Sequence, residues 1–265
     1  MTPIVCRAAA CLAALLLALA SVPSAFAANY CVNSTNQLRT ALASAATSIE
    51  DDVVRLVRGN YPLGSALSGS FNGSLVLRGG YAANCPALGR SLDASETRIY
   101  GTTVHASLVD LGLRNGDLEI DGLSFEDLAG VQVTDNTSGA VANGQVWVRR
   151  SRFVGNEYGL AVLTRHKNVR VENNLFLNNR SLCCASEFLS NGLAVRHSAA
   201  DAPDITVDVL FNTILGSPKS LVIQGGAPFS FPPRIQNNIL RGTNRPSGYC
   251  LKIDATQVYA RNNIW

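Results

Sequence analysis

The feature that most constrains the fold is a doublet of asparagines that recurs inside apolar runs. It stands in VENNLF (Val171 to Phe176), IQNNIL (Ile235 to Leu240) and YARNNIW (Tyr259 to Trp265). Asparagine is depleted in strands and favoured in turns, so each doublet marks a corner between two apolar segments. A relaxed form of the pattern adds LEIDGLSF (Leu118 to Phe125), VWVRRSRF (Val146 to Phe153) and VDVLFNTI (Val207 to Ile214). The six copies recur at a spacing that is typical of the repeats of a solenoid, with one longer interval before Val207.

The apolar spacing within each copy identifies the kind of solenoid. The first and third positions are apolar, which is a period of two and therefore a strand. Neither the frame of a leucine-rich repeat nor helical spacing recurs. The sequence therefore predicts an all-β parallel β-helix whose coils stack at strand spacing, roughly 4.8 Å. Four asparagines would then form a structural ladder at one corner, because an amide can both donate and accept hydrogen bonds along the stack: Asn174, Asn212, Asn238 and Asn263.

Earlier segments extend the helix toward the N-terminus. Strand-then-glycine stretches begin at Val53, Gly73 and Thr97, and they bring the β-helix of residues 53–265 to about nine coils. Residues 28–52 are expected to form an N-terminal cap with a short amphipathic helix, which covers the first open sheet edge. Leu38, Leu42, Ala45 and Ile49 mark the apolar face of this helix, and Ser34 with Gln37 forms a capping box. No polar capping segment follows the last copy, so we expect the native chain to continue beyond Trp265 or another chain to cover this end.

Three of these features together resemble a known superfamily. They are the opening NQLRTALASA…DDVVRLVRGNY, the segment LVLRGGYAANC and the repeated NN coils. The chain resembles secreted bacterial right-handed parallel β-helix proteins of the pectin-lyase-like superfamily, and the resemblance covers essentially all of the chain after its leader. It implies a right-handed β-helix, but it is a poor guide to activity, since that fold hosts lyases, hydrolases, phage tailspikes and surface proteins.

The leader, residues 1–27, has the composition of an export signal. Arg7 is its only charged side chain, an Ala/Leu-rich core runs from Ala8 to about Ala20, and Ala25 and Ala27 precede the cleavage point as a small-x-small pair. We therefore expect residues 1–27 to be a signal peptide and the protein to be secreted, periplasmic or on the cell surface, with no transmembrane segment after cleavage. The formal net charge of +3 gives no indication of a nucleic-acid partner.

Export also bears on the cysteines. Five of the seven lie outside the predicted leader. An oxidising compartment favours disulfides, so we predict a bridge from Cys31 to Cys85 that pins the cap to the following coil. Cys250 is expected to pair with Cys183 or Cys184, which leaves one thiol over. No Cys-x-x-Cys spacing accompanies these residues, so no metal site is predicted.

The sequence contains few residues that could act in catalysis. Glu119 and Asp121 lie two apart on one predicted strand, roughly 7 Å, and are the candidates for an inverting acid and base pair. Their more ordinary explanation is charge pairing with arginines on neighbouring strands. No cofactor is expected, and Ca²⁺ would enter only if the protein were a lyase with carboxylates on neighbouring coils. The three histidines are scattered and match no nucleophilic triad.

The remaining candidate is a binding face. Trp147, Arg170, Arg234 and Tyr259 fall in one outward column, where aromatic rings can stack on sugars and arginines can contact carboxylates. Alternatively, Trp147 only covers the stems of neighbouring side chains. The sequence thus favours a β-helix that binds a polysaccharide or a cell-surface partner. The other hypotheses are a polysaccharide lyase or glycoside hydrolase acting on an acidic glycan, and a structural stalk or passenger.

Overall fold

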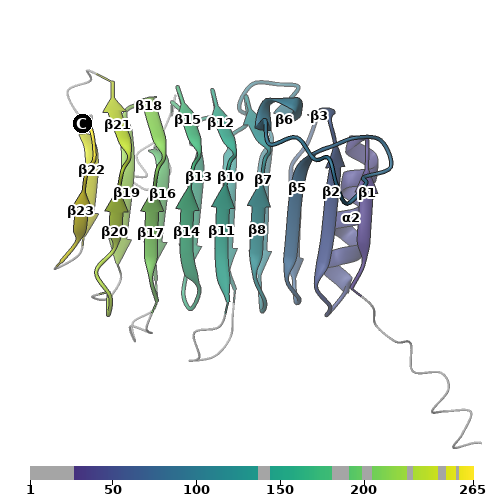
Figure 1. Ribbon diagram of the computed structural model, residues 1–265, viewed down its shortest axis with the longest axis horizontal. Helices are drawn as coiled ribbons and strands as arrows, with labels where there is room; N and C mark the ends of the chain where they lie inside the picture. Colours follow the sequence, from purple (N-terminus) through teal and green to yellow (C-terminus); the bar gives the residue numbers. More distant parts are fainter. Residues whose placement is uncertain are drawn as a thin grey trace, which may run out of the picture.

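Three long parallel β-sheets wind into a parallel β-helix, with one α-helix at its N-terminal end (Figure 1). The computed structural model describes residues 27–136, 144–180, 191–198, 205–225, 229–243, 249–254 and 257–265. From β2 onward the chain visits the sheets in a fixed order, which we name A, B and C, and then returns to sheet A one coil further along. Every strand pairs in parallel with the equivalent strands of the coils on either side, as expected of a solenoid.

The strands of each sheet come from successive coils. Among the described residues, sheet A has nine strands: β1 (Asn29–Val32), β2 (Asp52–Val57), β5 (Leu75–Tyr81), β8 (Leu118–Asp121), β11 (Gln145–Arg149), β14 (Asn168–Glu172), β17 (Val207–Leu210), β20 (Arg234–Gln236) and β23 (Tyr259–Arg261). Sheet B has seven: β3 (Gly59–Leu63), β6 (Thr97–Gly101), β9 (Ser124–Glu126), β12 (Arg152–Val154), β15 (Leu175–Leu177), β18 (Thr213–Ser217) and β21 (Ile239–Gly242). Sheet C also has seven: β4 (Leu67–Phe71), β7 (Leu108–Leu113), β10 (Gly130–Asp135), β13 (Leu160–Thr164), β16 (Asn191–His197), β19 (Lys219–Gly225) and β22 (Tyr249–Asp254).

The core consists of columns of inward side chains, one from each coil at equivalent positions. In sheet A, one inward column stacks seven β-branched or leucine side chains, all nearly inaccessible to solvent: Val54, Leu77, Ile120, Val148, Val171, Val209 and Ile235. In sheet B, Phe125, Phe153 and Phe176 stack with ring centroids 5.3 Å and 4.7 Å apart. Each coil covers the apolar side chains of the next. A single coil could not bury these side chains by itself.

The corner between sheets A and B explains the asparagine doublets. The first member of each doublet has a left-handed backbone, with φ of 55° at Asn173, 56° at Asn237 and 53° at Asn262. Asparagine tolerates that conformation better than most residues. The second member turns inward, where the Oδ1 of Asn212 accepts from the backbone N–H of Asn174 at 3.0 Å. The two asparagines therefore have different roles, one in turning the chain and one in bonding successive coils.

The ladder runs through all the copies of the corner. Backbone N–H groups of Asn174, Asn212 and Asn238 each donate to the Oδ1 of the next ladder asparagine, at 2.8 to 3.0 Å. Each Nδ2 in turn donates to a backbone carbonyl of the preceding coil, such as Val148 for Asn174 and Val171 for Asn212. Ser151 continues the line, since it accepts at Oγ from Leu123 N–H and donates its own N–H to Asn174.

Helix α2 (Thr35–Thr47) packs across the first coil. Ser34 is its N-cap and accepts from the backbone N–H of Gln37, whose Oε1 accepts from Asn33 N–H. Its buried face consists of Leu38, Ala41, Leu42 and Ala45. The disulfide predicted between Cys31 and Cys85 is confirmed, and it joins β1 to the loop that follows β5.

Three details differ from the sequence prediction. The segment beginning at Thr97, counted as one of the coils, does not begin a coil of its own; it is β6, which follows β5 and pairs with β3 and β9 in sheet B. Conversely, β1 lies in the region predicted as cap alone, yet it adds a strand to sheet A by pairing with β2. Ile49 lies beyond the end of α2 and is 74% exposed, so it does not belong to the apolar face of the helix.

A buried histidine makes the stability of the fold depend on pH. His197 is 1% exposed, its Nε2 lies 3.1 Å from the Arg165 carbonyl, and its Nδ1 has no hydrogen-bond partner among the described residues. Burial lowers the pKa of His197, against the opposing effect of that carbonyl. The unfolded chain, with a histidine pKa of about 6.5, then binds more protons than the folded chain. This contribution to stability is complete above about pH 6.5 and is lost as the pH falls toward the lowered pKa.

We therefore expect the thermal midpoint to fall on acidification from pH 7.5 to pH 5. The drop should be smaller in His197→Gln, whose amide can donate to the same carbonyl and does not titrate. The measurement is a pair of unfolding curves at each pH for the two proteins. Parallel drops in both would show that His197 is not the group responsible.

Candidate functional site

The outer face of sheet A gathers the residues that the sequence singled out. Its register places Glu119, Trp147, Arg170, Asp208, Arg234 and Tyr259 in one column on successive strands. Asp121, Arg149 and Glu172 follow one another in the parallel column two residues along. The strands thus bring the catalytic candidates and the candidate binding residues onto a single surface.

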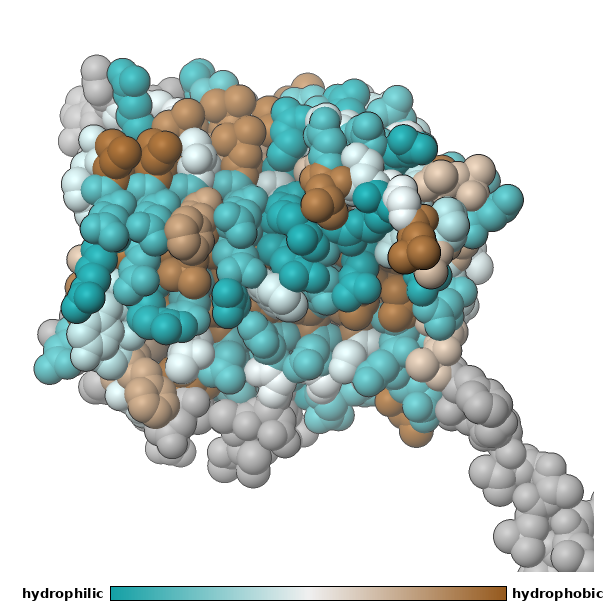
Figure 2. All heavy atoms as spheres, in the orientation of Figure 1, coloured by the Kyte–Doolittle hydropathy of each residue, from teal (hydrophilic) through white to brown (hydrophobic). Residues whose placement is uncertain are grey.

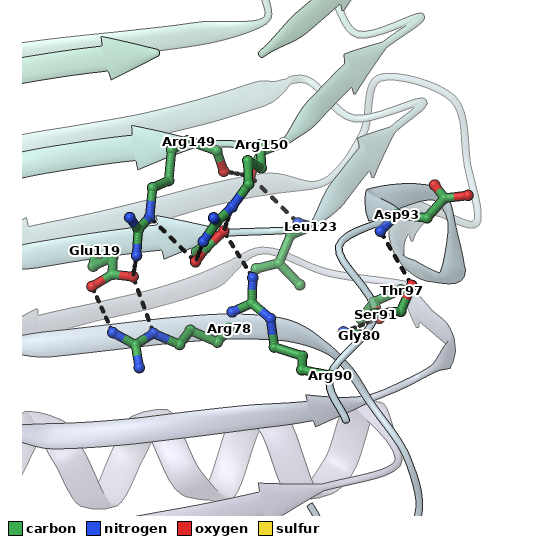
Figure 3. Close-up of polar contacts among 12 residues, drawn as sticks. Arg78, Gly80, Arg90, Ser91, Asp93, Thr97, Glu119, Leu123, Arg149 and Arg150 are labelled. Carbon is green, nitrogen blue, oxygen red and sulfur yellow. Dashed lines mark hydrogen bonds and ion pairs between the residues drawn. The ribbon is translucent and has the colours of Figure 1, made fainter. Parts of the chain in front are cut away.

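Glu119 is held by two arginines from neighbouring coils (Figure 3). Its Oε2 lies 2.9 Å from Arg78 on β5, and its Oε1 lies 2.9 Å from Arg149 on β11. Burial would raise the pKa of Glu119, but the hydrogen bonds and charges of Arg78 and Arg149 outweigh it and hold the pKa below its usual value.

Asp121 is the centre of a larger cluster, with a side chain that is only 1% exposed. Arg90, from the loop after β5, reaches its Oδ1 at 2.9 Å, and Arg149 Nε lies 3.2 Å from Oδ2. Arg150 binds both carboxylate oxygens, with Nε to Oδ1 at 2.8 Å. Burial opposes ionisation here too, yet the hydrogen bonds of Arg150 and Arg90 lower the pKa of Asp121.

These surroundings are the opposite of what acid catalysis requires. A general acid in glycoside hydrolysis needs a raised pKa so that it is protonated at working pH. Glu119 and Asp121 both have lowered pKa values, and arginines occupy their oxygens. The structure therefore gives the two carboxylates a structural role, namely cross-linking neighbouring coils and holding the loop that carries Arg90.

Trp147 is also engaged within the sheet. The guanidinium carbon of Arg149 lies 3.7 Å from the centroid of its ring, and its Nε1 donates to Glu172 at 2.9 Å. Arg170 in turn binds Glu172 at 2.6 Å. One face of the indole is thus covered by a cation and is not open to a sugar ring. This arrangement fits the alternative in which Trp147 covers neighbouring stems.

The other two predicted binding residues are more accessible. Arg234 binds Asp208 but its side chain remains 52% exposed, and Tyr259 is 52% exposed. They lie on adjacent strands of sheet A, four and five strands from Glu119 respectively. The structure does not bring Trp147 and Tyr259 within one compact site.

A hollow on the outer face of sheet C was missed by the sequence analysis. It encloses about 510 Å³ and lies over the neighbouring strands β4, β7 and β10. It is lined by side chains with hydroxyl, amide and carboxyl groups, together with two glycines: Ser68, Gly69, Ser70, Asp110, Gly112, Gln132, Thr134 and Asn136. No sequence motif marks this hollow, because the strands that supply these residues carry no repeated residue comparable to the corner asparagines.

The floor of the sheet C hollow is kept open by small residues. A Cβ at Gly112 would lie only 2.9 Å from the Nδ2 of Asn136. Gln132 Nε2 donates to Asp110 Oδ1 at 3.4 Å and to Thr134 Oγ1 at 3.2 Å. Burial raises the pKa of Asp110, against the opposing hydrogen bond from Gln132. The hollow is therefore a polar recess with both donors and acceptors, and its described lining includes the carboxyl group of Asp110.

Several other sequence predictions concern residues that the structure does not describe. Cys250 forms no disulfide there, and its predicted partners Cys183 and Cys184 lie outside the described residues, so that bridge stays a prediction. The same is true of nearly all of the predicted signal peptide, since residues 1–26 are not described. Among the residues that are described, no three His, Cys, Asp or Glu side chains come together as metal ligands. No helix in that part of the chain is long and apolar enough to span a bilayer.

Comparison with known proteins gives no further guide to function. No protein-family model, no curated protein and no solved structure matches the chain.

Proposed function

We propose that the chain is an exported β-helix protein that binds an extended polysaccharide through the outer faces of its sheets. The observation that carries this proposal is the hollow on sheet C. Sugar hydroxyl groups both donate and accept hydrogen bonds, and the lining offers donors and acceptors at short range in Gln132, Thr134, Asn136 and the serines. The three strands beneath it span roughly 10 Å, so a chain molecule lying across them would contact several coils.

The character of the visible surface supports a polar ligand. Figure 2, which views the molecule from the side of sheet A, shows a mostly hydrophilic surface whose hydrophobic residues occur in small groups and not in one broad patch. Obligate protein interfaces are usually more apolar than this. A polymer with many hydroxyl groups is the ligand that best matches a long polar surface.

Binding is favoured over hydrolysis by the number of acidic groups in the hollow. Glycoside hydrolysis uses two carboxyl groups on either side of the scissile bond. Of the described acidic side chains, Asp110 alone lines the hollow, and the pair on sheet A is tied up by arginines. Asp110 instead serves as an acceptor for sugar hydroxyls.

Family and location belong to the same proposal. The all-parallel sheets, the asparagine ladder and the capping helix support membership of the right-handed β-helix proteins of the pectin-lyase-like superfamily. The Cys31–Cys85 disulfide supports an oxidising compartment, in agreement with the leader sequence.

Retention on immobilised polysaccharides tests the proposal. Wild-type protein is passed over a panel of neutral and acidic plant and bacterial polysaccharides, and we expect retention on at least one. Asp110→Asn combined with Gln132→Ala removes the bridging hydrogen bonds of the hollow and should weaken that retention about tenfold, since each hydrogen bond contributes on the order of 1 kcal/mol.

The matched control is Gln236→Ala, which removes an outward glutamine of sheet A that does not line the hollow, and it should weaken retention much less than the double variant does. Thermal unfolding of every variant confirms that the fold is intact. Absence of retention of the wild type on the whole panel, or equal retention of the double variant, contradicts the proposal.

A further inference from the structure

The corner between sheets A and B contains one residue whose left-handed backbone is not explained by its own contacts, Phe211. In the described part of the chain, six copies of the corner have a left-handed backbone, and four of them place Gly or Asn there: Gly122, Asn173, Asn237 and Asn262. The exceptions are Arg150, with φ of 47°, and Phe211, with φ of 57°. A bulky aromatic residue in this region is strained. The two bonds to Asp121 explain Arg150, whereas the ring of Phe211 can form no such bonds and is 54% exposed.

Phe211 stands on the rim of a second hollow, which encloses about 550 Å³. Three successive coils build its floor. Each contributes one corner residue and, two positions later, one outward residue of sheet B: Arg150 with Arg152, Asn173 with Leu175, and Phe211 with Thr213. The loop segment Leu92–Ala94 forms the facing wall, and Leu92 is 59% exposed.

This wall is firmly fixed to the rest of the molecule. Arg90, two residues before Leu92, binds the buried Asp121 at 2.9 Å, and Ser91 N–H donates to the Gly80 carbonyl at 2.9 Å. Asp93 accepts from Ser95 and caps the short helix η1 (Ala94–Glu96). Figure 3 shows how Arg90, Ser91 and Asp93 follow one another along this loop beside the arginine cluster. The hollow is therefore preformed and needs no closure.

Arg152 gives the floor an available positive charge. It forms no salt bridge with any described residue, although Asp93 and Glu126 are near enough to feel its charge. Both carboxylates are already bound by closer partners, Asp93 by Ser95 at 2.8 Å and Glu126 by Arg98 at 2.6 Å. An exposed aromatic ring and this available arginine, two coils or roughly 10 Å apart, thus border the same recess.

We propose that this corner hollow is a second glycan subsite, selective for a sugar unit that carries an anionic group. One sugar ring stacks on Phe211, the carboxylate of the same or the next unit pairs with Arg152, and hydroxyl groups bond to Asn173 and Thr213. The strain at Phe211 is explained by this use, because the left-handed corner is what directs its ring outward over the hollow. The inference rests on the proposed function and adds to it a place and a charge preference.

Calorimetric titration with a uronic acid hexasaccharide tests the subsite. The comparison ligand is the same hexasaccharide with its carboxylates reduced to alcohols. We expect wild-type protein to bind the acidic form, Arg152→Gln to weaken that binding about tenfold, and the reduced form to bind wild type as weakly as the acidic form binds Arg152→Gln. Phe211→Asn should weaken binding of both forms about tenfold while raising the thermal midpoint, since asparagine relieves the strained backbone.

Controls separate the subsite from general effects of charge and apolar surface. Arg241→Gln changes another outward arginine of sheet B, and Phe231→Ala changes another exposed phenylalanine; both should bind like wild type. A hexaglutamate peptide should not bind, and equal affinity for it would overturn the proposal, because the hollow would then recognise charge alone.

Two outcomes distinguish this inference from the proposed function. If the wild type is retained on polysaccharides but Phe211→Asn and Arg152→Gln bind the hexasaccharide like wild type, the corner subsite is wrong and the proposed function stands. If the wild type binds no polysaccharide at all, the proposed function itself fails.

Discussion

Asp121→Ala is expected to lower the free energy of unfolding by about 3–5 kcal/mol, which is typical of removing one partner from a buried ion cluster. The carboxylate is 1% exposed and is bonded by Arg90, Arg149 and Arg150. Without this carboxylate, the guanidinium groups of the three arginines repel one another where little water can solvate them. Chemical denaturation measures the loss. Limited trypsin digestion should also reveal new cleavage after Arg90, because the loop loses its anchor.

Asp208→Ala provides the comparison for this result. Asp208 pairs with Arg234, whose side chain is 52% exposed and can be solvated once the carboxylate is removed. Asp208 itself is only 8% exposed, but its removal leaves no charge buried without a partner, so the loss should be clearly smaller than that of Asp121→Ala. Equal losses in the two variants would mean that Asp121 is no more than another surface charge.

Asn212→Ala is expected to cost roughly 2–5 kcal/mol, because it leaves two buried polar groups of the preceding coil without their hydrogen bonds. The backbone N–H of Asn174 loses its acceptor at 3.0 Å, and the Val171 carbonyl loses its donor at 2.8 Å. Denaturant unfolding provides the value. The neighbouring Asn237→Gly is the matched control, since glycine adopts the left-handed conformation of that corner residue without strain, and it should change stability by less than about 1 kcal/mol. A mild effect of Asn212→Ala would indicate that water replaces the amide.

The sequence predicted the parallel β-helix well wherever a residue's role was repeated. The doublet Asn173–Asn174 identified a corner and a ladder position, and alternation around it fixed which side chains of sheet A face outward. Alternation does not say to which sheet a strand belongs. The segment at Thr97 reads like the start of a coil but is a strand of sheet B, because the coil between β5 and β8 is unusually long.

The candidate site was less predictable, because it depends on which coils lie side by side. Ser68, Asp110 and Gln132 share one column of sheet C, although they are far apart in the sequence and no motif links them. The cover that Arg149 places on Trp147 is a side-chain conformation, and the register alone does not determine it. The sequence does carry a signal for Phe211, since aligning the copies puts a phenylalanine where most others have asparagine or glycine.

The stacking of coils also determines how the molecule would respond to a pulling force. Each strand pairs only with the coil before and the coil after it, at register partners such as Val146 with Val169 and Val169 with Val207. Tension applied near β23 would therefore peel off one coil at a time, and each would release roughly 80–130 Å of extended chain. The Cys31–Cys85 bond closes a covalent loop around the first coils. Extension would stop at Cys85, so the capped end would act as a mechanical anchor for a tether made of the remaining coils.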